Sequence, residues 1–452
     1  MAGENLKGAV SGNHVEQGRP LSAQGPLDAS WLRQLCLDCG ADDVGFVGID
    51  RPEIADQRHE IATVFPATKS LISIVCRMNR EPVRSPMRSV TNNEFHETYD
   101  HVNDVARKIT RRLEDLGIRA LNLVSAFPME VDRPGKSWIV GHKPVAEAAG
   151  LGKRGLHRSV IHPKFGSFVL LDTVLVAQPI SEESKPLDYN PCMECKLCVA
   201  ACPVDALGQD GSFNFSACFT HNYRDFLGNF TDWTGHLADS KNRQEFRERI
   251  SDGENITMWQ SLSFKPGYKA AYCISVCPAG EDVIGPYRED RIAFTNEFVK
   301  PLQALTETIY VLPRSDAEVS VPKRYPHKTM KRVPLTINGR RDPFTFFFVL
   351  TLTFQRRRAK GLSAIYHFHI DGKSPLDVRI EIDRQLLSVE FGTPEKPDCS
   401  VTLAEDTILH MLDGDFDLTR ALDEGKITLQ GPRDLLEQFI DCFPEYGDLA
   451  PA

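Results

Sequence analysis

Seven of the twelve cysteines in this 452-residue chain lie between Cys192 and Cys277, and their spacing is the clearest chemical signal in the sequence. The cysteines from Cys192 to Cys202 are separated by two, two and three residues, and Pro203 follows the last of them. A tight loop of this kind supplies three sulfurs to one iron–sulfur cube, while its fourth cysteine usually reaches a second cluster. Structural zinc sites more often pair two C-x2-C knuckles. The spacing therefore favours iron–sulfur clusters over zinc and predicts single-electron transfer.

A shorter element, Cys273-Ile-Ser-Val-Cys277-Pro278, repeats the end of this pattern. When the cysteines of the two elements are assigned to clusters by this pattern, Cys192, Cys195, Cys198 and Cys277 form one complete [4Fe-4S] site. The second site then has three sulfurs, from Cys202, Cys218 and Cys273. Ala270 stands where another C-x2-C would begin, so the second cluster is predicted to be [3Fe-4S], or [4Fe-4S] with a non-cysteine or open ligand. The alternative is a single cluster, with Cys218 an ordinary buried thiol.

The composition is that of a globular protein long enough for several domains. The formal net charge of −9 argues against a broad nucleic-acid-binding surface. No apolar run is long enough for a membrane-spanning helix. Residues 1–26 are polar and lack the apolar core of a signal peptide, so we expect a disordered tail. Iron–sulfur ligands and unpaired cysteines together predict a reducing, cytoplasmic location.

Alternating strand and helix patterns in residues 27–180 predict an α/β layer that would carry the first part of the site. Two apolar runs, 44–49 and 71–76, predict buried strands, and residues 120–124 and 168–176 predict two more. A helix is expected near residues 31–35, and apolar residues at helical spacing predict another over 102–116.

The cluster region is expected to span residues 181–300, with its long polar and aromatic middle, 219–267, forming an insertion or lid. Residues 301–334 begin with a helical pattern and continue with several prolines, which predicts a semi-rigid linker. The basic residues of this segment are interpreted as a solvated or docking strand.

Residues 335–448 are predicted to form a separate domain, an antiparallel sheet covered by helices. Aromatic and aliphatic residues alternate with period two from Phe344 to Phe354, which predicts a long strand. Further strands are expected at 364–370, 378–383, 386–391 and 426–431, and helices from 407 and over 432–443. No set of titratable residues stands out at catalytic spacing, so we interpret this domain as a binding or docking module.

This last domain resembles the sterol carrier protein-2 (SCP2) family. The resemblance rests on Asp398-Cys-Ser-Val-Thr-Leu403, Met411-Leu-Asp-Gly-Asp415 and Ala421-Leu-Asp-Glu-Gly-Lys-Ile-Thr-Leu-Gln-Gly431. It implies an apolar tunnel for a lipid or another hydrophobic molecule. The alternative is a degenerate copy that stabilises a homodimer or covers the active site.

The first 300 residues resemble the epoxyqueuosine reductase and reductive dehalogenase superfamily, which uses cobalamin and two clusters. Besides the order of the cysteines, three stretches carry the resemblance: Tyr99-Asp-His101, the segment from Gly141 to Gly155, and Gly166-Ser-Phe-Val-Leu-Leu171. The chain departs from the superfamily at Ala270, where a cluster cysteine is normal. The tRNA-binding helical repeats of epoxyqueuosine reductases and the twin-arginine leader of respiratory dehalogenases are also missing.

The segment Ala149-Gly-Leu-Gly-Lys-Arg-Gly155 is the most distinctive match outside the cysteines. Glycines allow backbone N–H groups to approach a bulky ligand closely. The resemblance implies that Gly150, Leu151, Gly152 and Gly155 contact a corrinoid; the alternative is a tight helix-to-strand turn.

Reduction at carbon also needs protons, which His or Lys can supply near neutral pH. His142 and Lys143 precede the glycine-rich segment, with an ordinary role at the helix end as the alternative. In the superfamily an acidic residue or a tyrosine near the corrin donates the proton, which makes Asp132 the candidate acid and Tyr99 and His101 the other candidates.

The predicted fold class is therefore α/β (α+β), with an N-terminal α/β cobalamin-binding-like domain, a bacterial ferredoxin-like two-cluster domain and an SCP2-like domain. We expect a cytoplasmic reductase that takes electrons from a ferredoxin or flavodoxin-type donor. It would pass them through two clusters to cobalamin and reduce an apolar substrate by removing halogen or oxygen. The alternatives are an electron-transfer protein without cobalamin and a lipid-binding scaffold with a residual redox domain.

Overall fold

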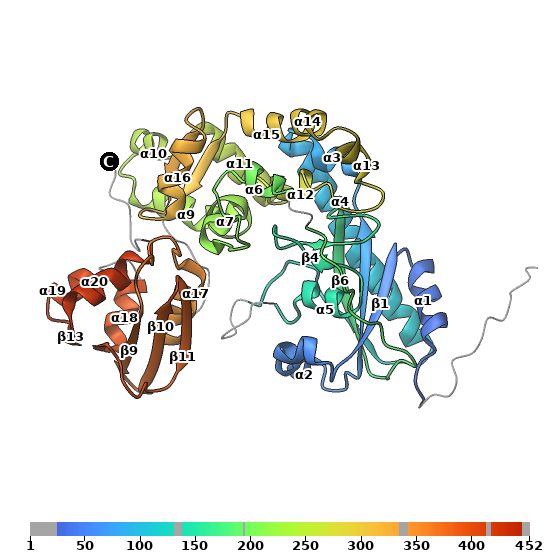
Figure 1. The fold of residues 1–452 in the computed structure, drawn as a ribbon, viewed down its shortest axis with the longest axis horizontal. Coiled ribbons are helices and arrows are strands. Elements are labelled where there is room, and N and C mark those ends of the chain that lie inside the picture. The colour runs from blue at the N-terminus through green and yellow to red at the C-terminus, as the bar shows by residue number, and fades with distance from the viewer. Residues whose placement is uncertain (1–24, 131–137, 193–194, 334–341, 413–416, 445–452) are drawn as a thin grey trace, which may run out of the picture.

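The computed structural model describes residues 25–130, 138–192, 195–333, 342–412 and 417–444. The expected disordered tail therefore lies outside the described residues, apart from residues 25–26. Figure 1 shows an N-terminal lobe and a C-terminal lobe, joined by a helical region that passes above both. None of the helices described is long and apolar enough to span a lipid bilayer.

The N-terminal lobe contains a four-stranded sheet in the order β1-β2-β6-β3, with antiparallel neighbours throughout. Its strands are β1 (Asp43–Gly48), β2 (Ser70–Arg77), β3 (Ala120–Asn122) and β6 (Val169–Val176), which confirms the predicted strands. Helices α1 (Ala29–Asp38) and α4 (Arg88–Asp115) pack on one face. Helices α2 (Arg58–Val64) and α5 (His142–Ala148) pack on the other. Burial of both faces explains why these strands are continuous apolar runs.

Two short elements, β4 (Lys153–Arg154) and β5 (Val160–Ile161), pair as a small hairpin directly after α5. They extend the N-terminal lobe toward the helical region (Figure 1). The glycine-rich segment of the sequence therefore connects α5 to this hairpin.

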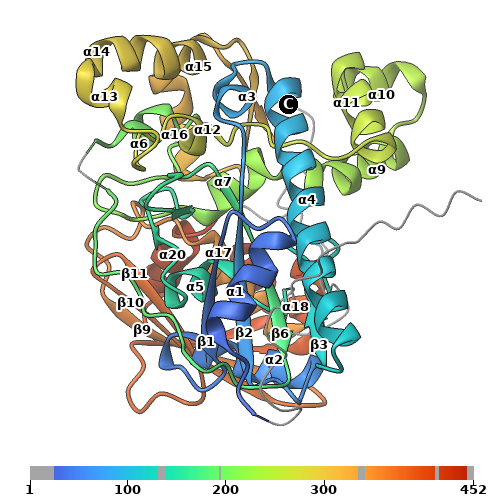
Figure 2. The same ribbon diagram turned by 90° about the vertical axis from the view of Figure 1, so that its right-hand side faces the viewer.

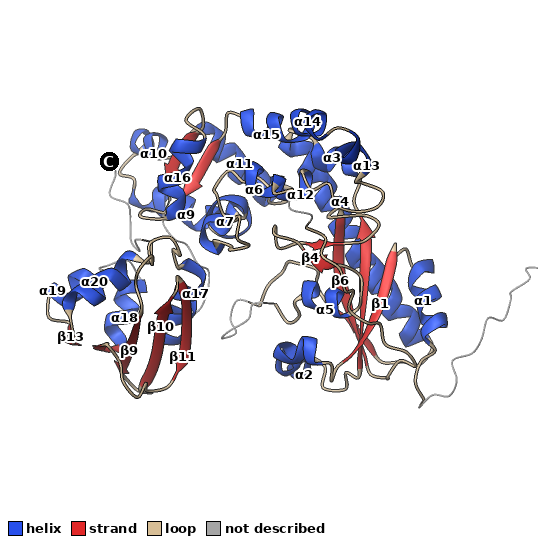
Figure 3. Ribbon diagram, in the orientation of Figure 1, coloured by secondary structure: helices blue, strands red, loops and turns tan. Residues whose placement is uncertain are grey.

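Short helices make up most of the connecting region, as the colouring by secondary structure shows (Figure 3). Cysteines lie on α6 (Leu197–Ala201), α7 (Phe215–Asn222) and α12 (Tyr272–Ser275). Within the segment predicted as an insertion, the structure has α8 (Arg224–Leu227), α9 (Asn229–Asp239), α10 (Arg243–Arg249) and α11 (Asp252–Ser263). The remaining short helices are α3 (Arg80–Arg84), α13 (Gly285–Glu289), α14 (Arg291–Phe294) and α15 (Lys300–Ala304).

The prediction of a proline-rich linker at 301–334 was wrong in its second part. This segment folds as β7 (Thr308–Val311), α16 (Asp316–Arg324) and β8 (Thr329–Arg332), and β7 pairs with β8 in parallel. Its basic residues are solvated only in part: Lys323 and Arg332 are exposed, whereas Lys328 is buried against Glu307 at 2.6 Å and Lys331 pairs with Glu254 at 2.7 Å. Glu307 belongs to the segment itself, whereas the pair between Lys331 and Glu254 ties the segment to the cluster region.

The C-terminal lobe has a five-stranded sheet in the order β11-β10-β9-β12-β13. Its strands are β9 (Ala364–Asp371), β10 (Leu376–Asp383), β11 (Leu386–Phe391), β12 (Cys399–Ala404) and β13 (Ile427–Gln430). Neighbours are antiparallel except β9 and β12, which pair in parallel, so the expected antiparallel sheet is mixed at this point. Helices α18 (Glu405–Leu412), α19 (Leu418–Asp423) and α20 (Arg433–Asp441) supply residues to its core. Figure 2 gives the view at right angles.

The long strand predicted from Phe344 to Phe354 was wrong, because this segment is helix α17 (Pro343–Thr353). In a strand Phe344, Phe346 and Phe348 would share one face. Instead Phe346 is 4% exposed, while Phe344 and Phe348, four residues apart, are each 39% exposed. Nearly every residue of this run is apolar, so the sequence pattern does not distinguish period two from period 3.6.

Candidate functional site

The two cysteine elements have the same local backbone. Helix α6 begins after Lys196 (φ 51°) and helix α12 after Ala271 (φ 57°), both in the left-handed region. Cys198 and Cys273 each lie two residues after the left-handed residue. By the same alignment, Ala270 stands in the second element where Cys195 stands in the first. The backbone position of the missing eighth cysteine is therefore present, and Ala270 occupies it.

The structure brings the predicted sulfur ligands together in two adjoining groups. The thiols of Cys192, Cys195 and Cys277 all lie close enough to Cys198 to interact with it electrostatically. Cys273 interacts in the same way with Cys218 and Cys202, and it also lies close to both Cys198 and Cys277. Pattern pairing assigns Cys198 and Cys273 to different groups, and helices α6 and α12, which carry them, contact each other.

The surroundings of these sulfurs suit iron–sulfur ligation. The backbone N–H of Leu156 donates to Cys192 Sγ at 3.2 Å, and that of Ala206 donates to Cys202 Sγ at 3.3 Å. Such hydrogen bonds tune the potential of a cluster. Burial raises the pKa of Cys277 to about 12, and that of Cys218 to about 12. These thiols are therefore protonated without iron, and ligation releases their protons.

At Ala270 the backbone is held by protein partners. Asn222 Oδ1 accepts hydrogen bonds from the N–H groups of Ala270 (3.1 Å) and Ala271 (2.8 Å). The Ala270 carbonyl accepts from Arg88 at 2.6 Å. Ala270 itself is buried and offers only a methyl group to the second sulfur group. This matches a cluster with three protein sulfurs.

Three tyrosines adjoin the second sulfur group. Tyr223 lies within electrostatic reach of Cys218 and Cys273, and also of Tyr99. The Tyr99 and Tyr268 hydroxyls are 3.0 Å apart. Burial raises the pKa of all three phenols, so they keep their protons at neutral pH. Tyr99, one of the predicted proton donors, thus adjoins Tyr223, which lies near the cysteines.

Aromatic rings surround this cluster of hydroxyl groups. Tyr268 contacts Phe95 edge-on with ring centroids 5.0 Å apart, and it lies 4.7 Å from Phe226. Phe226 in turn stacks on Phe127 at 5.0 Å. The second sulfur group therefore faces an apolar, aromatic environment that contains phenolic protons.

The other predicted donors are placed differently. Both ring nitrogens of His142 have partners, Thr173 Oγ1 at 2.9 Å and the Val124 carbonyl at 3.0 Å. Because a carbonyl only accepts, the Nε2 atom carries the proton; burial lowers the pKa of His142 to about 4. Lys143 lies within electrostatic reach of Cys218 and Cys273. His101 lies at the surface beside Gly40, and Asp132 lies outside the described residues.

The glycine-rich segment makes close contacts chiefly with the chain itself. A Cβ atom at Gly150 (φ 70°) would lie 2.3 Å from the Lys185 carbonyl oxygen, and one at Gly152 would lie 2.5 Å from the Ile161 carbonyl oxygen. Leu151 is buried in the core of the N-terminal lobe. Such contacts are expected of a tight helix-to-strand turn, which was the alternative to a corrinoid site.

Gly155 differs from the other glycines because it faces the sulfurs. A Cβ atom there would lie 2.6 Å from Ile161 Cδ1, 3.2 Å from Cys192 Sγ and 3.4 Å from the His157 ring. His157 is buried, and among the described residues its Nε2 atom has no hydrogen-bond partner. His157 also lies within electrostatic reach of Lys143. A polar ligand group is therefore expected between His157, Lys143 and the cysteines.

Tyr223, Tyr268 and His157 were missed as site residues from the sequence. Tyr268 lies two residues before Ala270 and Tyr223 five residues after Cys218, so nearness to the cysteines was the available signal. Nothing in their spacing indicates that they converge with Tyr99, which comes from helix α4 in another segment.

The C-terminal lobe contacts the helix that carries Cys218. Gln355, which follows α17, is completely buried, and its Nε2 donates to Ser216 Oγ at 2.9 Å. Its Oε1 accepts from Asn214 Nδ2 at 3.1 Å, and Asn214 caps the N-terminus of α7. Nearby, Arg357 pairs at 2.7 Å with Asp205, three residues after Cys202. The position of the C-terminal lobe is therefore coupled to the second sulfur group.

Comparisons with known proteins agree with both parts of the chain. Residues 185–208 match the 4Fe-4S binding domain family, and residues 352–444 match the SCP-2 sterol transfer family. An epoxyqueuosine reductase from Staphylococcus aureus is 28% identical over 189 residues, covering 40% of this chain and 42% of the relative. The chain combines an epoxyqueuosine reductase-like region with an SCP2-like domain. The suspected fusion is thus confirmed, although the chain matches less than half the length of this relative.

Two solved structures are also similar. A catabolic reductive dehalogenase aligns with a TM-score of 0.32 and 16% identity, covering 39% of this chain and 25% of that one. Palmitated SCP2L2 from Aedes aegypti aligns with a TM-score of 0.20 and 19% identity, covering 23% of this chain and 98% of that one.

Proposed function

We propose that this protein is an iron–sulfur oxidoreductase that delivers electrons, one at a time, to an apolar organic substrate bound beside the second cluster. The observation that carries the proposal is the pair of adjoining sulfur groups. The second group lies near Tyr223 and Lys143, and Tyr99 and Tyr268 adjoin Tyr223. Replacing a carbon–halogen bond by a carbon–hydrogen bond takes two electrons and one proton and releases halide. Removal of oxygen as water takes two electrons and two protons.

Electrons enter at the first cluster in this proposal. Cys192 and Cys195 of the first group are partly exposed, as are Cys218 and Cys273 of the second, whereas Cys198 and Cys277 are buried. A ferredoxin or flavodoxin-type donor would dock over Cys192 and Cys195, in the cytoplasm. The contact between Cys198 and Cys273 gives the route to the second cluster.

Protons come from the tyrosine group. Tyr99, Tyr223 and Tyr268 hold their protons at neutral pH, and the hydrogen bond between Tyr99 and Tyr268 lets one phenol replace a proton lost by the other. The aromatic rings around them exclude water and favour an apolar substrate.

Cobalamin fits one part of the predicted site and not another. Gly150 and Gly152 do not offer room, because carbonyl oxygens of the chain fill their Cβ positions. The unpartnered His157 Nε2 and the nearby Lys143 do suit the polar side chains of a corrinoid. When bound, a corrinoid supplies a cobalt centre that accepts cluster electrons and passes them to carbon. His157 and Lys143 would orient it toward Cys218.

The SCP2-like domain supports an apolar substrate or lipid as the partner. Its buried contact through Gln355 keeps it against the cluster region, where it could present such a molecule. The acidic balance of the chain favours this over a nucleic acid, and binding of a tRNA stem loop is the outcome that would reverse this preference.

The test is metal analysis of anaerobically purified protein after addition of hydroxocobalamin and gel filtration. Retention of about one cobalt per chain with about seven or eight irons supports the cobalamin-dependent reductase. H157A should lower cobalt retention without changing the iron content. Iron without retained cobalt would contradict cobalamin dependence and leave an electron-transfer protein with a lipid-binding domain.

A further inference from the structure

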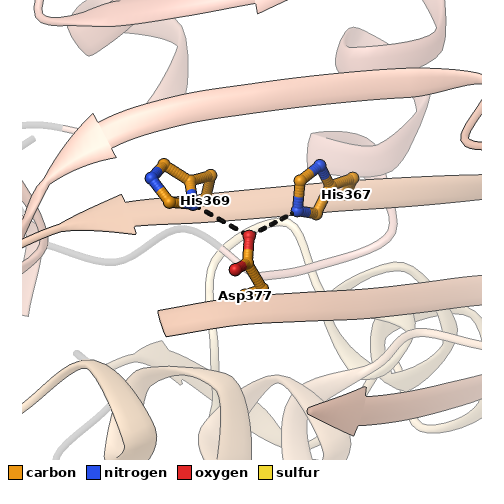
Figure 4. Close-up of side chains that lie close together, drawn as sticks. All are labelled: His367, His369 and Asp377. Carbon is orange, nitrogen blue, oxygen red and sulfur yellow. Dashed lines mark hydrogen bonds and ion pairs between the residues drawn. The ribbon is translucent and has the colours of Figure 1, made fainter. Parts of the chain in front are cut away.

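The outer face of the C-terminal sheet carries a group of ligand-type side chains that the sequence pattern did not reveal. His367 and His369 lie on β9, and Asp377 lies on the neighbouring strand β10 (Figure 4). Core residues alternate with them along β9, so both histidines point away from the hydrophobic core. Asp377 is paired directly with His369 across the two strands. The expectation that this domain has no such cluster was therefore wrong.

The three side chains converge on one point. Asp377 Oδ1 lies 2.7 Å from His367 Nε2 and 2.8 Å from His369 Nδ1. All three ligand atoms lie within 4.8 Å of one another, and in the described part of the chain this is the one such group of histidine, cysteine and carboxylate ligands. The cysteines are spaced more widely, as a polynuclear cluster requires.

The spacing suits a single metal ion. Ligand atoms about 2.1 Å from an ion and 2.7–2.8 Å apart subtend about 80–85° at it, close to the right angle of octahedral coordination. Three protein ligands leave three positions of an octahedral ion open. The side chains are 17–33% exposed, so water can fill those open positions.

The neighbouring residues prepare these side chains to bind a cation. His369 Nε2 hydrogen-bonds to Asp371 Oδ1 at 3.1 Å, which orients the ring with Nδ1 toward Asp377. A carboxylate on the second nitrogen is the usual support for a metal-binding histidine, because it fixes the ring and raises its basicity. Arg379, opposite His367, is occupied by Glu381 (2.5 Å) and Glu390 (3.5 Å). Arg379 is thus paired with glutamates, and the Asp377 carboxylate interacts with the two imidazoles.

We propose that His367, His369 and Asp377 form a binding site for a divalent first-row transition ion on the outer face of the SCP2-like domain. Imidazole nitrogens and a carboxylate favour ions such as Fe²⁺, Co²⁺, Ni²⁺ and Zn²⁺ over Ca²⁺ or Mg²⁺. The ion replaces the protons that the two imidazoles share with Asp377 Oδ1. The site is separate from the cysteine clusters, so this proposal does not depend on the proposed reductase function.

The test is equilibrium dialysis of the tag-free, cluster-loaded full chain against Ni²⁺ without oxygen, with bound nickel and iron measured by mass spectrometry. Wild type should bind one nickel per chain. H367A, H369A and D377N should each lower the affinity for that ion more than tenfold. D371N, which keeps all three ligands, should weaken binding about tenfold. H410A removes an exposed histidine paired with Asp406 in the same domain and should bind like wild type.

Iron content and the thermal unfolding midpoint of each variant establish that it is folded and holds its clusters. Equal nickel binding by wild type, H367A and H369A would overturn the site and leave a hydrogen-bonded trio that only joins β9 to β10. Equal loss in H410A would likewise overturn it, because binding would then depend on surface histidines in general.

Discussion

The cysteines around α6 and α12 and the half-buried trio on β9 and β10 are both groups of side chains that can ligate metals, but the chain assembles them differently. Most cluster sulfurs come from two short local motifs, whose spacing within a loop is the geometry of the site. The trio depends on the register between two strands, since Asp377 meets His369 only because these residues are paired. Local motifs can therefore be predicted from spacing alone, whereas a cross-strand site becomes evident only when the pairing is known.

The largest expected effect separates the two sets directly. C198S removes a buried sulfur from the first group and should lower the iron content by about four atoms per chain. C76S removes a buried thiol on β2 that belongs to neither sulfur group, and H369A removes a ligand of the trio. Both should keep the full iron content. Iron loss in C76S equal to that in C198S would contradict the assignment, because it would indicate general unfolding.

The coupling between the SCP2-like domain and the cluster region provides the next test. Q355L leaves the polar groups of Asn214 and Ser216 buried without their partner, which should lower the free energy of unfolding by about 2–4 kcal/mol. R356A removes an exposed ion pair with Asp210 and should cost about 0–1 kcal/mol. Chemical denaturation of the cluster-loaded chain measures both. Equal effects would show that Gln355 does not join the two parts.

Stability should also depend on pH through buried neutral histidines. Burial lowers the pKa of His142 to about 4 and that of His221 to about 3, from 6.5 in the unfolded chain. Below about pH 6.5 the unfolded chain takes up protons that the folded chain does not. As the pH is lowered from 6.5 to 4, the free energy of unfolding should therefore decrease, by up to about 1.4 kcal/mol per pH unit for each histidine. H142Q should reduce this slope; an unchanged slope would contradict the role of His142.

The smallest expected change concerns the second cluster. A270C restores a sulfur at the position that corresponds to Cys195 and should raise the iron content by about one atom per chain if the wild-type cluster is [3Fe-4S]. A271C, one residue away, has no such counterpart and should not. Iron and sulfide analysis of the two variants gives the comparison, and an equal rise in both would contradict the structural equivalence of Ala270 and Cys195.

Strongly patterned elements could be predicted from the sequence. The strands at 44–49 and 71–76 are confirmed, because short apolar runs are typical of strands buried on both faces. The helix predicted over 102–116 is the C-terminal half of α4, which begins earlier, at Arg88. The segment 344–354 failed because its apolar residues fit both periods. The segment 301–334 failed because its prolines and lysines indicated solvent. In the structure Lys328 is buried against Glu307 of the same segment, and Lys331 pairs with the distant Glu254.

The same distinction applies to the candidate site. The sulfur groups and Tyr99 could be proposed from motifs and resemblance. Tyr223 and Tyr268 could not, because they meet Tyr99 only through the packing of α4 against the cluster region. Gln355 could not either, since a glutamine after an apolar run carries no sign of its buried partners.

The measurement that tests the central claim most directly is the iron and sulfide content of anaerobically purified wild type and C218S, with electron paramagnetic resonance of both. Two clusters sharing seven cysteines predict about seven or eight irons in wild type and about four in C218S, which keeps only the first cluster's signal. About four irons in both proteins, with identical spectra, would contradict the account and make Cys218 an ordinary buried thiol.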